Sequence, residues 1–254
     1  MDVQTLKKVD LTAYLEKFWQ SDYRHDGRAF NERRAVSIDS GSLSSAEGSS
    51  LVRMGGTMMI CGIKAEVAAP TAAHPSKGYL VVNVDYPPIC AFKFKGPAPN
   101  ELSQSHSHEL SMAAEKVLNL EELCIESGQL VWTLYADILC ISFDGNGFDC
   151  ALSALIKALQ SVKLPQVKLS ETGIVEASKE LFQKLSISPI SSFSFCFHGK
   201  KLLIDPCADE EEALCNQIRI ICNTQHLIEV KHCGLIDQGL LQEAIEMSLE
   251  MVRN

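Results

Sequence analysis

The stretch DILCISFDGNGFDCALSALIKAL, residues 137–159, decides the fold because it joins an apolar strand directly to an apolar helix. Its first part completes a long strand-like run that begins at residue 128 and ends in an Asn-Gly turn signal. Its second part is predicted as a helix so apolar that it suits burial between layers, and Pro165 ends it. The stretch therefore predicts the centre of a layered domain.

Strand-like and helical segments continue on both sides of this centre. Expected strands cover 35–39, 49–69 with a hairpin turn at Gly55-Gly56, 78–88, 190–206 and 214–233. Expected helices cover 5–20, 101–119 and 237–252, and the polar stretch 166–187 is expected to connect two halves. Strands followed by helices, twice over and with few crossover units, predict an α+β fold.

Composition predicts a soluble globular protein. The 254 residues suit one large domain or two small ones, and 46% are apolar and 22% charged. No apolar run reaches the roughly 18 residues that a membrane span needs. The N-terminal stretch is charged and lacks a signal-peptide core, so an intracellular protein is expected.

Cysteines and net charge exclude some functions. The ten cysteines form no CxxC pair, and most lie within apolar runs, which favours buried reduced thiols over zinc sites or disulfides. The formal net charge of −9 argues against independent RNA binding, because proteins that bind nucleic acid alone are usually basic over the binding face.

An acidic cluster lies in LLIDPCADEEEALCNQIRI, residues 202–220, where Asp205 and residues 209–212 are all acidic. Clustered carboxylates can hold Mg²⁺ for phosphate chemistry, or they can form a solvated turn. His106 and His108 lack further ligands at metal spacing and are expected at a solvated helix start. The residues alone indicate an α+β protein of undetermined role.

Five segments, in order, resemble the ribonuclease PH superfamily. They are RHDGRAFNERR (24–34), SAEGSSLVRMGGTMMICGIKAEVAAP (45–70), NVDYPPICAFKFKGPAP (83–99), the stretch 137–159, and LLIDPCADEEE (202–212). The resemblance runs from about residue 22 to about residue 250. It implies the ribonuclease PH fold, with two ribosomal S5 domain 2-like β-α halves. These halves would be 22–165 and 188–254, joined by 166–187 and preceded by a helix within 1–21.

The resemblance also implies that catalytic positions are lost. Active members bind phosphate through a Gly-Ser/Thr-Arg segment, because a guanidinium holds and neutralises the anion. Here Phe148 replaces the arginine, and Asp149 follows it with a carboxylate expected to repel phosphate. Active members also carry two carboxylates six residues apart, and here Glu211 is matched by the neutral Gln217. No catalytic residue, metal or cofactor is therefore expected.

Within the family, the resemblance is greatest to non-catalytic ring subunits of the eukaryotic RNA exosome. It implies a structural subunit that helps to line the RNA path for 3'-to-5' processing and decay of rRNA and mRNA. The implied partners are other ribonuclease PH-like subunits, paired as heterodimers in a six-membered ring, and cap proteins. The implied locations are nucleus, nucleolus and cytoplasm.

RNA contacts are expected from few residues. Lys93 and Lys95, interleaved with aromatic residues, are the first candidates and Arg53 is a weaker one, although the lysines also suit a solvated loop or a subunit contact. Two other functions stay open. One is a phosphate-dependent 3'-to-5' exoribonuclease, which Phe148 and Gln217 disfavour. The other is a binding protein that acts outside any ring.

Overall fold

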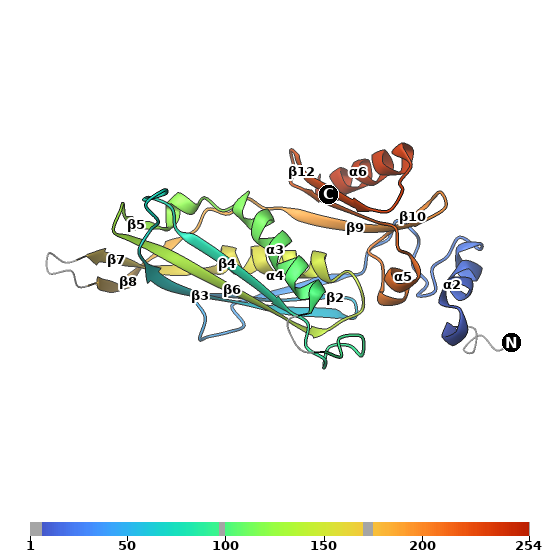
Figure 1. Cartoon of the computed structure of the whole chain (residues 1–254), viewed down its shortest axis with the longest axis horizontal. Helices are drawn as coiled ribbons and strands as arrows, with labels where there is room; N and C mark the ends of the chain where they lie inside the picture. The colour runs from blue at the N-terminus through green and yellow to red at the C-terminus, as the bar shows by residue number, and fades with distance from the viewer. Residues whose placement is uncertain (1–6, 97–99, 170–174, 254) are drawn as a thin grey trace.

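The computed structural model describes residues 7–96, 100–169 and 175–253 (Figure 1). Its larger sheet has the order β1-β2-β3-β6-β4, with β5 paired to β6. The strands are β1 (Val36–Ser40), β2 (Gly48–Met54), β3 (Thr57–Ala68), β4 (Tyr79–Asp85), β5 (Cys124–Glu126) and β6 (Leu130–Ser142). All of them lie in the predicted first half.

The larger sheet is built around β3 and β6. The predicted hairpin joins β2 to β3, and Gly55 at its turn has a positive φ of 56°, which glycine adopts without strain. Strands β3 and β6 pair antiparallel, whereas β4 pairs with β6 in parallel. The crossover that parallel pairing requires contains the helix α3 (Glu101–Glu115) and the short 3₁₀ helix η1 (Leu120–Leu123).

Helix α4 (Gly147–Ser161) begins directly after β6 and packs on β2 and β3, while α3 packs on β4. Alternate residues of β3, namely Met59, Cys61 and Ile63, are fully buried beneath the helices. Most of α4 is buried, because it also contacts β9 of the second half. This confirms the prediction of a buried strand joined to a buried helix.

The second half has a smaller sheet of order β10-β9-β11-β12. Its elements are β9 (Ser191–His198), β10 (Lys201–Ile204), the short helix α5 (Ala208–Ala213), β11 (Gln217–Cys222), β12 (Leu227–Cys233) and α6 (Gln238–Arg253). The buried side chains of Phe193, Phe195 and Ile220 pack with Leu240 and Ala244 of α6. Each half thus consists of a sheet with helices on it, as the α+β prediction requires.

The predicted connection contains two strands. Strands β7 (Lys163–Leu169) and β8 (Val175–Lys184) form a two-stranded hairpin that projects from the end of the molecule opposite α2 (Figure 1). Helix α2 (Leu11–Trp19) is capped by Asp10 and packs through Leu15 and Trp19 beside β10 and α5. Residues 5 and 6 of the predicted first helix lie outside the described residues.

All ten cysteines are free, and seven of them are buried. This agrees with the expectation of buried reduced thiols, except that Cys215 and Cys233 are exposed and Cys124 is half-buried. In the described ranges, no helix combines the length and the apolarity needed to cross a bilayer.

Candidate functional site

The arginine-rich segment 24–34 lies against the loop that follows β10. Arg24 is fully buried, with Nη1 2.7 Å from the carbonyl oxygen of Ile204 and Nη2 3.0 Å from that of Asp205. Its guanidinium also pairs with both carboxylate oxygens of the buried Glu210. Because all these partners lie in the second half, two of the five segments that carried the sequence resemblance, 24–34 and 202–212, are joined in space.

Asp205 connects the same segment to the turn before α4. Arg34 donates through Nε to Oδ2 at 2.9 Å and through Nη2 to Oδ1 at 2.7 Å, and Asn146 Nδ2 lies 2.7 Å from Oδ1. Burial alone would raise the pKa of Asp205, but the hydrogen bonds and charge of Arg34 outweigh it and lower the pKa to about 2. Asp205 and Asn146 both have positive φ angles, 52° and 49°, which asparagine and aspartate tolerate best.

A pocket of about 600 Å³ lies beside this junction, between the two halves. Helix α3, the start of α4, and strands β11 and β12 contribute to its lining. Among the residues singled out from the sequence, Lys93, Phe148, Glu211 and Gln217 line it, although they are scattered along the chain. Phe148, where an arginine was expected in active members, therefore lines the same pocket as Glu211 and Gln217, the two positions of the carboxylate pair.

A guanidinium that the sequence did not reveal lies over Phe148. Arg219 Cζ is 3.7 Å from the centroid of the Phe148 ring, and Arg219 pairs directly with Lys231 in the register of β11 and β12. Both cations form ion pairs with Glu109 of α3. Burial would raise the pKa of Glu109, but Lys231 and Arg219 outweigh it, so this pKa lies below its ordinary value. The pocket thus contains an arginine whose charge an internal carboxylate balances.

Glu211 lies at the N-terminus of α4. Its Oε1 accepts a hydrogen bond from the backbone N–H of Asn146 at 2.6 Å, and Lys93 Nζ lies 4.0 Å from its Oε2. Helix N-termini present free amides that attract anions, and here the anion is a side chain of the protein itself. Burial raises the pKa of Glu211, and the Asn146 hydrogen bond and the charge of Lys93 oppose this only in part.

Asp149 has a different role from the predicted one. Its buried carboxylate accepts hydrogen bonds from the backbone N–H of Ser194 at 2.8 Å and from the Ser194 hydroxyl at 2.9 Å. The side chain therefore faces β9 and is not among the described residues that line the pocket. Asp149 fixes α4 to the second half rather than repelling phosphate.

Both histidines were expected at a solvated helix start, but they lie within α3 rather than at its start, and only His108 is exposed. His106 is buried in the pocket wall, and its Nδ1 lies 2.8 Å from the hydroxyl oxygen of Tyr86. Burial and the nearby charge of Arg219 lower the pKa of His106 to about 3. The imidazole is therefore neutral at physiological pH. His108, two residues later, is exposed on α3.

The predicted RNA contacts differ in their surroundings. Lys93 Nζ lies 3.9 Å from the centroid of the Phe143 ring and faces the pocket, whereas Lys95 Nζ lies 4.8 Å from the centroid of Phe92. Phe92 is 85% exposed. Arg53 is exposed on β2, and its Nε donates to the carbonyl of Gly55 at 3.1 Å.

The three predicted RNA contacts lie at the same end of the larger sheet. Arg53 pairs with Met58 across the β2–β3 hairpin, and Met58 pairs with Ser142 at the end of β6. The next residue, Phe143, donates its backbone N–H to the carbonyl of Cys90, just before the lysines. The fold therefore brings together two segments separated by about forty residues of sequence.

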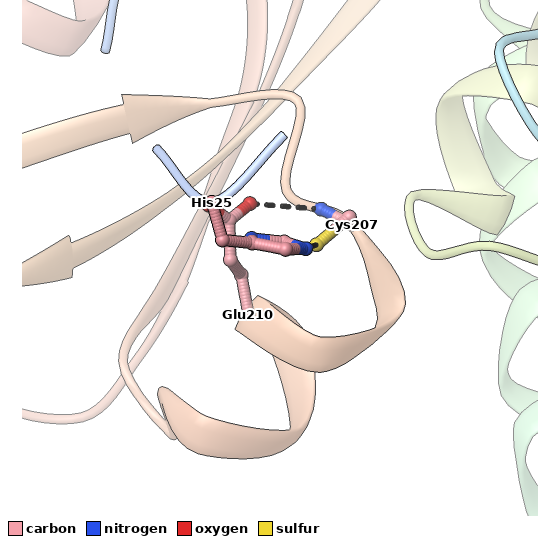
Figure 2. A group of neighbouring side chains, drawn as sticks. All are labelled: His25, Cys207 and Glu210. Carbon is pink, nitrogen blue, oxygen red and sulfur yellow. Dashed lines mark hydrogen bonds between the residues drawn. The ribbon is translucent and has the colours of Figure 1, made fainter. Parts of the chain in front are cut away.

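His25, Cys207 and Glu210 are the described cluster whose atoms could in principle surround a cation, and Figure 2 shows them beside the start of α5. The donors do not suit a metal. Glu210 already pairs with Arg24 and accepts the backbone N–H of Cys207 at 3.0 Å. Burial raises the pKa of the Cys207 thiol to about 12, and its Sγ already lies 3.8 Å from His25 Nε2. The cluster joins the N-terminal segment to α5.

Comparisons with known proteins agree with this geometry. Residues 32–165 match the family model described as RNase PH, 3' exoribonuclease family, domain 1. Exosome complex component rrp43 of Schizosaccharomyces pombe is 35% identical, over 95% of this chain and 92% of that protein. Exosome complex component Rrp42 of Methanopyrus kandleri is 30% identical, over 98% of this chain and 94% of that protein. A chain of the Archaeoglobus fulgidus exosome with RNA bound to the active site has a TM-score of 0.84 and 26% identity, over 96% and 95%.

Proposed function

The chain belongs to the RNase PH 3' exoribonuclease family, and on this basis we propose that it is a non-catalytic ring subunit of an RNA exosome. Relatives that match it over nearly their full length are named as exosome complex components. Segments 83–95 and 130–150 are the parts of the chain that most resemble eukaryotic exosome component 8. Because the matches cover nearly the full length of these relatives, they support a ribonuclease PH fold that is retained for assembly of the ring.

The proposed partners follow from the resemblance. Other ribonuclease PH-like subunits pair with the chain as heterodimers of a six-membered ring, and cap proteins cover the ring. RNA passes through the assembled channel for 3'-to-5' processing and decay, and the complex acts in nucleus, nucleolus and cytoplasm. Lys93, Lys95 and Arg53 are the proposed RNA contacts, and all three are exposed, although Lys93 also lies 4.0 Å from Glu211.

The position of Glu211 carries the non-catalytic part of the proposal. Phosphorolysis needs a free phosphate held by cations and helix amides near the scissile bond. Here the Glu211 carboxylate accepts the Asn146 amide, and Glu109 balances the charges of Arg219 and Lys231. Phe148 and Gln217 offer neither a guanidinium nor a carboxylate for the reaction. Each lysine and arginine among the described residues that line the pocket therefore already has a carboxylate within 4.0 Å, which disfavours phosphate binding.

Gentle purification of the tagged chain, followed by native mass spectrometry, tests the ring role. We expect one copy of this chain among different related subunits in a complex of several hundred kilodaltons. A monomer or a homo-oligomer under the same conditions would contradict the ring assignment. Fluorescence microscopy of the tagged chain tests the three proposed compartments. Exclusion of the tagged chain from the nucleus would contradict the proposed nuclear and nucleolar locations.

The runner-up is a phosphate-dependent exoribonuclease, and the presence of Arg219 in the pocket is the observation in its favour. Incubation of the pure chain with RNA and inorganic phosphate distinguishes the two functions. We expect no phosphate-dependent release of nucleoside diphosphates. Release that depends on Arg219, shown by its loss in Arg219→Ala, would establish the enzyme instead.

A further inference from the structure

Strand β4 forms one edge of the larger sheet, and a groove of about 720 Å³ runs along it. On one side β4 pairs with β6, and α3 lies beside the other side. The groove is lined by residues 80–85 of β4 and by one face of α3, namely Ser103, Gln104, Ser107, His108 and Ser111. The three serines are spaced four residues apart, and their small side chains leave space for the groove on this face of α3.

At the edge of β4, the backbone amides at the two ends of the groove have hydrogen-bond acceptors, whereas those between them have none among the side chains and loops of the described residues. The N–H of Gly78 donates to the carbonyl of Leu120 at 3.0 Å, and the N–H of Val84 donates to Ser107 Oγ at 2.8 Å. Neighbouring residues of a strand direct their backbone groups to opposite sides. Leu80 and Val82 therefore share the side of Gly78 and Val84, away from β6. Within the described ranges, no side chain or loop backbone bonds to their amides.

Polar side chains in the groove also lack partners. Ser103 is 1% exposed, and its Oγ has no hydrogen-bond partner among the described residues. The buried Oδ1 of Asp85, at the end of the strand, likewise has none within the described chain. Buried polar groups are usually paired, so both atoms indicate a missing polar partner in this groove.

We propose that the edge of β4 binds an extended segment of another protein chain, which adds a strand at Leu80 and Val82 and places a basic side chain near Asp85. An extended polypeptide offers the alternating N–H and C=O groups that an open strand edge requires. Asp85 is the acidic residue of the groove, and none of the described residues that line it is a lysine or an arginine. A nucleic acid would therefore find no cation for its phosphates here, and the net charge of −9 also favours a basic partner.

This inference goes beyond the ring assignment and does not depend on it, because the groove belongs to the single chain. The pocket that contains Phe148 lies on the other side of α3, and Ser105, His106 and Glu109 line that pocket rather than the groove. Binding in the groove and chemistry in the pocket can therefore be tested separately.

Amide hydrogen exchange of the full-length chain, followed by NMR, tests the proposal directly. The probe is an alternating lysine–valine hexapeptide at millimolar concentration, with an alternating glutamate–valine hexapeptide for comparison. We expect the lysine peptide to slow exchange at Leu80 and Val82 at least fivefold. Val84, already bonded to Ser107, serves as the internal reference and should change little.

Variants of α3 locate the effect. Ser111→Trp fills the groove, and Gln104→Trp at its exposed rim provides a second variant should the first fold poorly. Met112→Trp is the matched control, because Met112 is 46% exposed and is not a groove residue. We expect either groove variant to abolish the slowing and the control to retain it. Unchanged exchange with the lysine peptide, slowing that survives both groove variants, or equal slowing by the glutamate peptide or by oligouridylate would overturn the proposal.

Discussion

The Arg34 guanidinium binds both carboxylate oxygens of Asp205, with Nε 2.9 Å from Oδ2 and Nη2 2.7 Å from Oδ1. The two residues lie 171 positions apart in the chain. Arg34 also donates through Nη1 to the carbonyl of Asp144 at 2.6 Å, in the turn before α4. One side chain thus connects the N-terminal segment, the first half and the second half.

Asp205→Asn is expected to lower the free energy of unfolding by about 3 kcal/mol, because it removes the buried carboxylate that Arg34 binds through two nitrogens and leaves only the more exposed Asp144, 3.6 Å away, as its ionic partner. Urea denaturation followed by circular dichroism measures the change. Asp209→Asn, in the first turn of the following helix α5, is the matched control. Its partly exposed carboxylate pairs with Lys7, so its loss should cost less than about 1 kcal/mol. Equal costs for the two variants would contradict the proposed importance of the buried pair.

Acid should weaken the fold through Asp205. Its pKa of about 2 in the folded chain lies below the ordinary aspartate value of about 3.9, so the unfolded chain takes up a proton first as pH falls. The stabilisation is present above pH 4 and is lost as pH falls toward 2. Between pH 5 and pH 3 it should fall by about 1 kcal/mol. Urea denaturation of Asp205→Asn should lack this component, and an identical pH profile in both proteins would refute it.

Glu211→Gln should raise the free energy of unfolding at neutral pH. Burial raises the pKa of Glu211, so the folded chain binds this proton more tightly than the unfolded chain does. The stability that protonation provides is present below the ordinary pKa and is lost as pH rises through the raised one. Glutamine keeps the neutral form and can still accept the Asn146 N–H. Its advantage over wild type should therefore grow from pH 4 to pH 7, whereas the exposed Glu212→Gln should show no such trend.

Phe148→Arg should not restore phosphorolysis. The new guanidinium would enter a buried position directly beside that of Arg219, and the lost aromatic packing should cost about 3 kcal/mol. Thermal denaturation measures the loss, and a nucleoside diphosphate assay measures the activity. Phe148→Leu, which keeps an apolar side chain, should cost about 1 kcal/mol. Phosphate-dependent activity in the arginine variant would show that this single position controls catalysis.

Lys95→Ala should weaken RNA binding by the assembled complex and reduce the slope of log K against log salt by about 1, as expected for one lost phosphate contact. Filter binding of single-stranded RNA over a salt series measures the slope. Lys200→Ala is the control. This exposed lysine lies in the turn between β9 and β10, which is separate from the loop after β4 that carries Lys95 (Figure 1). A common slope for both variants and the wild type would exclude Lys95 as a contact.

Local patterns predicted the elements well. The turn at Gly55-Gly56 and the strand before α4 follow from residue preferences over a few positions, so the sequence carried them directly. The joining of 24–34 to the acidic loop was not predicted, because it rests on tertiary contacts between residues more than 170 positions apart. The hairpin of β7 and β8 was missed, since a two-stranded hairpin requires no strongly apolar pattern.

The pocket chemistry was harder to predict, because it depends on register and tertiary contacts. Arg219 and Lys231 meet only because β11 and β12 pair in this register, and Glu109 reaches them from a helix of the other half. Asp149 turns toward Ser194 because α4 packs on β9. None of these contacts has a signature in the spacing of residues along the chain.

The position of Arg24 has a consequence for synthesis. Its guanidinium is bound mainly by Ile204, Asp205 and Glu210, which the ribosome adds more than 170 residues later, and its contact with the earlier Glu32 carbonyl is a long 3.5 Å. During translation the early arginines must stay hydrated or be held by another protein, because their permanent acceptors do not yet exist. A transcript broken before codon 205 would yield a chain that cannot bury this charge. Burial of the Arg24 charge must therefore follow the synthesis of residues 204–210.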